Sequence, residues 1–158
     1  MNLPKEFDYY IKKGIVRRIK PNIQKAGFLI SESETSLRGL NKRLDLMGID
    51  EDNANSIIKD SYDILMELIR AKLLTDGYSA SGNFAHEAEI SYLKILNFPD
   101  NDVLFLNELR YSRNSITYYG TILDKEYAEK VIDYTKKHYE KLKELLKQEK
   151  HKKAEEDN

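Results

Sequence analysis

The amino-acid sequence predicts an all-α protein, an antiparallel up-and-down helical bundle with four core helices plus an extra N-terminal helix. Only three prolines and seven glycines interrupt the chain, and long alternating strand patterns are absent. Apolar residues recur instead at three- and four-residue steps, the spacing of amphipathic helices. The connections between these segments are short, which favours antiparallel neighbours. With 158 residues, the chain is long enough to form one domain with a buried core.

The N-terminal part, residues 1–30, is expected to form a helix and a linker. Pro21 ends this helix, because the proline ring is incompatible with a helix interior. The helical bundle itself is expected over residues 31–146. The apolar residues of the N-terminal helix stand at four-residue steps: Phe7, Ile11, Ile15 and Ile19.

The first two helices of the bundle have recognisable ends. The first is expected to begin near Ser31, where Ser31 and Glu34 can form a capping box, and to end before Gly48. The next is expected to begin after Asp50, a favourable N-cap residue, and to run up to Gly77. Their apolar stripes are Leu37, Leu40, Leu44 and Met47 in the first, and Ala54, Ile57, Ile58, Leu65, Leu68 and Ile69 in the second.

Three further helices follow. One is expected from about residue 83 to residue 96, ending against Pro99, and another from about residue 102 to residue 119, closed by Gly120. The last is expected to begin near Asp124. Its apolar and aromatic residues have a near-heptad spacing: Tyr127, Val131, Tyr134, His138, Leu142 and Leu145.

The C-terminal segment, residues 147–158, is rich in charge and has no apolar stripe. We expect a frayed, solvated end. A basic arm for nucleic acid is the alternative, but the acidic residues Glu155, Glu156 and Asp157 cancel most of its charge. The lysines of such an arm would be Lys147, Lys150, Lys152 and Lys153.

Composition excludes several classes of protein. The chain has no cysteine, which excludes disulfides, thiolate nucleophiles and cysteine-ligated zinc, and we expect a reducing, cytoplasmic setting. No apolar run exceeds five residues and the start has no apolar signal region, so no membrane partner is expected. The net charge is −1, with 26 basic against 27 acidic residues, so any site for a polyanion must be local.

Motif spacing excludes further chemistry. A di-iron bundle needs Glu-x-x-His pairs, a nucleotide-binding P-loop needs a glycine-rich loop before Lys-Ser/Thr, and neither pattern occurs. A nucleophile elbow and a helix-turn-helix signature are also missing. We therefore expect no metal and no cofactor.

His86 begins the helix in the segment GNFAHEAEISYL, one turn before Ile90, and should lie on or beside the buried face. Two interpretations stay open at this point. One is a half-buried histidine bonded to a neighbour, and the other is a group that transfers a proton. Glu87 and Glu89 are close in sequence but point in different directions on a helix, which argues against a metal site.

The segment LRYSRNSITYYG, residues 109–120, concentrates two arginines, one asparagine and three tyrosines in an expected helix. An arginine presents a planar fork of donors and an asparagine presents a bidentate amide, both of which suit phosphate. A compact anion-binding surface results if four side chains lie on one side of the helix: Arg110, Arg113, Asn114 and Tyr118. The alternative is a bundle helix whose arginines pair with carboxylates such as Glu108 or Asp124.

Three segments together carry a resemblance to a known family: AKLLTDGY at residues 71–78, HEAEISYL at 86–93 and RYSRNSITYYG at 110–120. Over about residues 31–146 the chain resembles HEPN domains, in particular stand-alone archaeal ones. The resemblance implies an antiparallel helical bundle that commonly forms a homodimer.

The resemblance also implies a class of function, RNA or nucleotide binding. Many HEPN proteins are metal-independent endoribonucleases that act by attack of the ribose 2′-hydroxyl, through an arginine followed after four to six residues by histidine. Others are non-catalytic binding modules, or partners of a small nucleotidyltransferase in toxin–antitoxin pairs. Both possibilities stay open for this chain.

Carried over residue by residue, Arg113 matches the motif arginine and Asn114 the polar residue that often follows it, whereas Tyr118 stands where the family has histidine. A phenol has a pKa near 10 and is a poor base at neutral pH, although Tyr118 can donate a hydrogen bond to phosphate or act as a general acid. The resemblance thus implies binding more than cleavage. Arg113, Asn114 and Tyr118 are its catalytic set, and the expected substrate-binding residues are Arg110, Tyr119 and His86.

Overall fold

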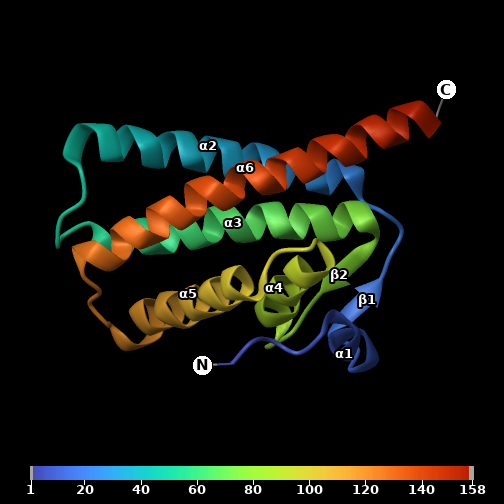
Figure 1. The fold of residues 1–158 in the computed structure, drawn as a ribbon, viewed down its shortest axis with the longest axis horizontal. Coiled ribbons are helices and arrows are strands. Elements are labelled where there is room, and N and C mark those ends of the chain that lie inside the picture. The colour runs from blue at the N-terminus through green and yellow to red at the C-terminus, as the bar shows by residue number, and fades with distance from the viewer. Residues whose placement is uncertain (1, 157–158) are drawn as a thin grey trace.

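The computed structural model describes residues 2–156, except for the side chains of 149–154, and confirms the expected all-α helical bundle (Figure 1). Three long helices run side by side along the molecule, and two shorter ones pack along the other flank of α3. The elements in the described part are α1 (Phe7–Lys12), β1 (Val16–Arg18), α2 (Ile23–Met47), α3 (Ala54–Asp76), β2 (Tyr78–Ala80), α4 (Ala85–Ile95), α5 (Asp100–Tyr119) and α6 (Lys125–Glu156).

Helix α3 forms the centre of the molecule. It contacts α2 and α6 on one side and α4 and α5 on the other, so most of its apolar side chains are buried. Gly77 closes it in the left-handed conformation with a φ of 88°. A Cβ atom at Gly77 would lie 3.0 Å from the carbonyl oxygen of Ile19, so only glycine allows this close approach to the strand segment.

The N-terminal region differs from the expectation. The predicted helix through Ile15 and Ile19 is wrong beyond Lys12, because Gly14 takes a left-handed φ of 73° and ends the helical turn. Residues Val16–Arg18, of which Val16 is β-branched, form β1, which pairs antiparallel with β2 in the register Val16↔Ala80. Strands of three residues are too short to give a recognisable alternating pattern.

Helix α2 begins earlier than expected, at Ile23 instead of near Ser31. The side chain of Asn22 caps it by accepting a hydrogen bond of 3.0 Å from the backbone N–H of Lys25. Residues 23–30, assigned above to a linker, are therefore the first two turns of a bundle helix. The expected capping box lies inside that helix.

The other helix ends agree better with the sequence. Asp50 accepts hydrogen bonds from the backbone N–H groups of Asp52 and Asn53, in the turn before α3. Asp124 accepts a hydrogen bond of 2.8 Å from the N–H of Tyr127 at the start of α6, and Gly120 closes α5 in the left-handed conformation.

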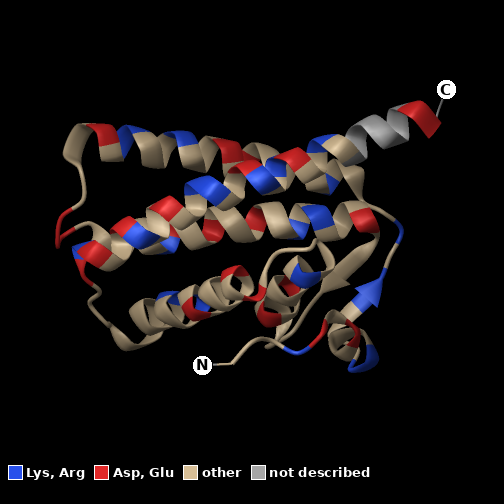
Figure 2. Cartoon of the chain, viewed as in Figure 1, with Lys and Arg blue, Asp and Glu red and all other residues tan. Residues whose placement is uncertain are grey.

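Helix α6 continues as far as Glu156, so the charged segment expected to fray is helical over residues 147–156. The side chains of Lys150, Lys152 and Lys153, together with residues 157 and 158, lie outside the described residues. Figure 2 shows basic and acidic residues interspersed along the long helices, as the balanced composition predicts. No helix in the described part of the chain is long and apolar enough to cross a membrane.

Candidate functional site

The predicted site residues divide into two groups, because α5 points its two arginines inward and its last tyrosines outward. The side chains of Arg110 and Arg113 are only 14% and 22% exposed, respectively. They face polar residues of α3 and α4 at the place where the three helices meet. The site therefore lies between helices, not on one exposed face of α5.

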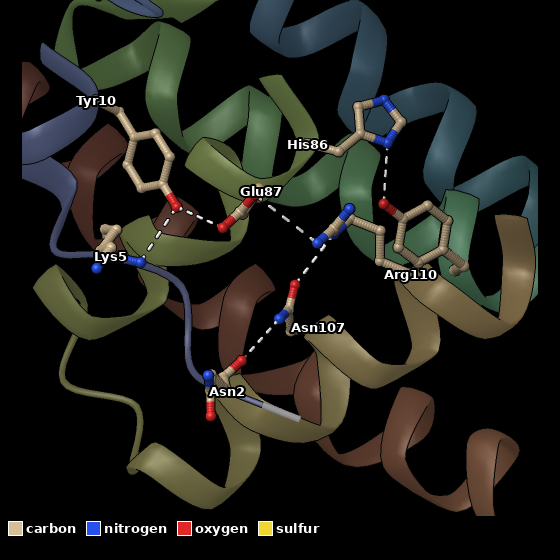
Figure 3. A network of polar contacts seen from close by, with 8 residues as sticks. Asn2, Lys5, Tyr10, His86, Glu87, Asn107 and Arg110 are labelled. Carbon is tan, nitrogen blue, oxygen red and sulfur yellow. Dashed lines mark hydrogen bonds and ion pairs between the residues drawn. The ribbon is translucent and has the colours of Figure 1, made fainter. Parts of the chain in front are cut away.

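Arg110 is held by one hydrogen bond, one aromatic contact and one longer ion pair. Its Nε donates a hydrogen bond of 3.1 Å to Oδ1 of Asn107, one of its terminal nitrogens lies 3.9 Å from Oε2 of Glu87, and its guanidinium stacks 4.5 Å from the Tyr111 ring centroid. Nδ2 of Asn107 in turn donates to the backbone oxygen of Asn2, so Arg110 belongs to a polar network beneath the N-terminal segment (Figure 3).

Arg113 is engaged much less. One terminal nitrogen lies 3.9 Å from Oδ1 of Asp63, which is beyond hydrogen-bonding distance, and the guanidinium carbon lies 5.9 Å from the Tyr62 ring centroid. Its Nε is buried and has no hydrogen-bond partner among the described residues. The suggested pairing of these arginines with Glu108 or Asp124 is not what the structure has, since the carboxylates beside them come from α3 and α4.

His86 is half-buried and bonded to a neighbour, the first of the two interpretations above. Its Nδ1 lies 2.9 Å from the hydroxyl of Tyr62 (Figure 3). Burial lowers the pKa of His86 and favours the neutral imidazole, with the Glu89 carboxylate acting in the opposite direction and Arg70 and Arg113 adding to the decrease. Burial also raises the pKa of Tyr62, which keeps its phenol protonated.

A pocket of about 180 Å³ opens beside His86 and is lined by Asp63, Met66, Glu67 and Arg70 of α3. Burial is the main reason that the pKa values of Asp63 and Glu67 are raised. The pocket thus combines a neutral imidazole with carboxyl groups that hold protons more readily than usual.

Arg70, which lines this pocket, is held by an ion pair with Glu89. Arg70 donates two hydrogen bonds to buried Glu89, of 2.9 and 3.1 Å, in a bidentate arrangement. Sequence reasoning missed Asp63, Glu67 and Arg70. Their spacing of four and three residues gives a polar stripe on one face of an otherwise apolar helix, which is the signal that could have revealed them.

Tyr118 and Tyr119 are not brought to the arginines. Tyr118 is 70% exposed at the end of α5, and Tyr119 is more exposed still. Five residues along a helix correspond to a rotation of about 140°, so Tyr118 and Arg113 cannot share a face. The side chain of Asn114 makes no hydrogen bond within the described chain. The expectation of one anion-binding side is wrong, while the roles of these residues stay predictions.

Comparison of the chain with protein-family models, with curated proteins and with solved structures finds no match. The HEPN resemblance therefore stays a prediction based on the motifs quoted above. Among the side chains that the structure describes, no group of three or more His, Asp or Glu could hold a metal ion. Function has to be inferred from the side chains where α3, α4 and α5 meet.

Proposed function

We propose that the protein binds RNA or a nucleotide through a phosphate group held by Arg113 beside the His86 pocket. The state of Arg113 supports this most directly: the guanidinium is largely buried, its Nε has no acceptor, and its nearest carboxylate is not hydrogen-bonded to it. Phosphate oxygens fit the guanidinium fork and would satisfy these donors. Arg110 contributes positive charge nearby, and its Nε already donates to Asn107.

Binding of phosphate would displace Asp63 from Arg113. The existing contact is weak at 3.9 Å, and partial burial already raises the pKa of the Asp63 carboxyl. Even the singly charged phosphodiester of RNA, held within hydrogen-bonding distance, interacts more strongly with the guanidinium than a carboxylate 3.9 Å away. Asp63 therefore competes with the ligand and weakens its binding.

We propose His86 instead of Tyr118 as the base, should the bound RNA be cleaved. With Nδ1–H donating to the Tyr62 oxygen, Nε2 carries the lone pair that accepts the proton of the ribose 2′-hydroxyl. The 2′-oxygen attacks the adjacent phosphorus, a cyclic phosphate forms, and the departing 5′-oxygen takes a proton from solvent. Arg113 stabilises the charge that develops on the phosphoryl oxygens.

A non-catalytic binding module, including a nucleotidyltransferase partner, is the second candidate. The acidic side chains beside His86 favour it, because Asp63 and Glu67 oppose the additional negative charge of a cleavage transition state. Cleavage, if present, should therefore be weak, insensitive to chelators, and dependent on His86.

We also propose that two copies associate through one end of the bundle. The ends of α2 and α5 and the loop to α6 lie towards the same end of the bundle (Figure 1), and large exposed side chains occur in each of them: Leu46, Met47, Tyr118, Tyr119 and Ile122. Light scattering at tens of micromolar chain should report a dimer, and replacement of Tyr119 with Ala should shift the population towards monomer. Monomer only, in the wild type, would refute the dimer.

RNA binding measured by fluorescence anisotropy tests the proposed function. Arg113→Ala should weaken affinity for a single-stranded oligonucleotide about tenfold. It should also make the slope of log affinity against log salt concentration shallower by about one, as expected for the loss of one phosphate contact. Arg17→Ala is the matched control, since Arg17 is exposed on β1, away from the site, and should change affinity little. Equal losses in the two variants would mean that attraction is diffuse and that Arg113 holds no phosphate.

A further inference from the structure

A larger pocket lies on the other side of Arg110, between the N-terminal segment, α4 and α5. Figure 3 shows Arg110 between His86, which lines the smaller pocket, and Asn107, which lines this one. The volume is about 560 Å³, within the range of small-molecule sites. Its walls are formed by Asn2, Leu3, Lys5, Glu87, Asn107 and Tyr111.

The walls are held in place by hydrogen bonds. Asn107 is only 3% exposed, and both ends of its amide are used, one accepting from Arg110 and the other donating to the backbone of Asn2. Oε1 of Glu87 accepts a hydrogen bond of 2.9 Å from the hydroxyl of buried Tyr10. This fixes the carboxylate, so that its two oxygens have different surroundings.

Two polar groups of the pocket have no hydrogen-bond partner in the described chain. Oε2 of Glu87 has only the 3.9 Å contact with Arg110, and the ammonium of Lys5 has no ion pair. The ring of Tyr111 is about half exposed and is stacked by the Arg110 guanidinium. The pocket therefore offers an acceptor, a cation and an aromatic ring polarised by a stacked arginine.

We propose that this pocket is a nucleobase subsite, in which a base with an exocyclic amine stacks on Tyr111 and donates that amine to Oε2 of Glu87. The subsite rests on the proposed function, because the base would belong to the RNA or nucleotide whose phosphate Arg113 holds. A carboxylate only accepts hydrogen bonds, so it pairs with the amine of adenine or cytosine and repels the carbonyl oxygen that uracil has at the same position. Stacking on tyrosine tolerates any base, so the selectivity comes from Glu87.

Nucleosides without phosphate separate this subsite from phosphate binding. Titration of the full chain with adenosine, followed by nuclear magnetic resonance, should shift the signals of the Asn107 side-chain amide and the Tyr111 ring. Purine riboside, the same nucleoside without the amine, should bind about tenfold more weakly, as expected when a hydrogen bond to a charged acceptor is lost.

Two variants assign the contacts. In Glu87→Gln, Tyr10 keeps the remaining amide oxygen, so the amide NH₂ faces the pocket and the preference for adenosine should disappear. Tyr111→Ala should weaken both nucleosides at least about fivefold, whereas Tyr111→Phe should not. Phe28→Ala, which removes an exposed aromatic ring of α2, is the control, and thermal unfolding checks that each variant is folded.

The outcomes distinguish the two proposals. Absence of adenosine binding at the Asn107 and Tyr111 signals, or equal affinity for adenosine and purine riboside, overturns the subsite even if RNA binds through Arg113. Adenosine binding that depends on Glu87, in a protein whose RNA affinity ignores Arg113→Ala, supports the subsite while the phosphate site fails.

Discussion

Two regions of this molecule place a histidine beside a carboxylate and a tyrosine, and they differ in access. In the first, His86 of α4 is half-buried, bonds to Tyr62, and lines a pocket. In the second, His138 of α6 is only 3% exposed. Its ring centroid lies 4.1 Å from that of Tyr134 at an interplanar angle of 54°, and its Nε2 lies 3.4 Å from Oδ1 of Asp102 without forming a hydrogen bond.

The comparison shows that composition alone does not identify a site. Burial lowers the pKa of both histidines, and each has a carboxylate within reach. Only His86 combines a fixed hydrogen bond with an opening that a ligand can enter. His138 fills the seam between α6 and the start of α5, where packing against Phe98 and Tyr134 explains its position.

The largest effect should come from Arg70, which lines the His86 pocket and forms an ion pair with Glu89. Arg70→Ala leaves the buried carboxylate of Glu89 without its partner, which should lower the free energy of unfolding by about 3 kcal/mol. Chemical denaturation measures this loss. Lys12→Ala, which removes an exposed pair with Asp8, is the control and should leave stability unchanged. Similar losses in both would show that the Arg70 pair is no more important than a surface contact.

A smaller effect is expected in the pH dependence of the free energy of unfolding, to which both histidines contribute. In the unfolded chain the two histidines become protonated near pH 6.5. In the folded chain they become protonated only at lower pH, because burial lowers both pKa values. Stability should thus be complete above about pH 6.5 and fall as pH decreases towards the folded pKa values. His138→Phe should reduce this loss, which denaturation at several pH values detects. The same variant should bind RNA like the wild type, and weakened binding would contradict a purely packing role for His138.

The smallest effect should come from Tyr118, the residue at the histidine position of the motif. Because it is exposed and points away from Arg113, Tyr118→His should neither create nor increase cleavage of RNA. His86→Gln, in contrast, should abolish any cleavage that the wild type has. A gain of activity in Tyr118→His would show that the end of α5, and not the His86 pocket, holds the reacting phosphate.

Sequence reasoning succeeded where local chemistry decides the structure. Gly77 and Gly120 end helices through their left-handed conformation, and Asp124 caps α6, all of which follow from short-range rules. It failed at Gly14, where the apolar spacing of the following isoleucines continued the helical pattern although the glycine broke it. Propensity and spacing are compatible both with a continued helix and with a turn followed by a strand, and they do not show which of these the tertiary contacts favour.

The sequence identified some residues of the site, but not how they are arranged in space. Arg113 and His86 were identified from their helical segments, but their carboxylate neighbour Asp63 lies 50 residues before Arg113 in sequence. Nothing local indicates that α5 turns this arginine towards α3 and leaves Tyr118 in solvent. That orientation is set by the packing of three helices, which a single sequence does not display.

The competition between Asp63 and a phosphate for Arg113 offers the most direct test. RNA affinity is measured for the wild type, Asp63→Asn, Arg113→Ala and the double variant, at one salt concentration. Asp63→Asn should tighten binding, Arg113→Ala should weaken it, and Asp63→Asn should gain little once Arg113 is absent. If Asp63→Asn weakens binding, or tightens it equally with and without Arg113, then Arg113 does not hold the phosphate and the proposed site is wrong.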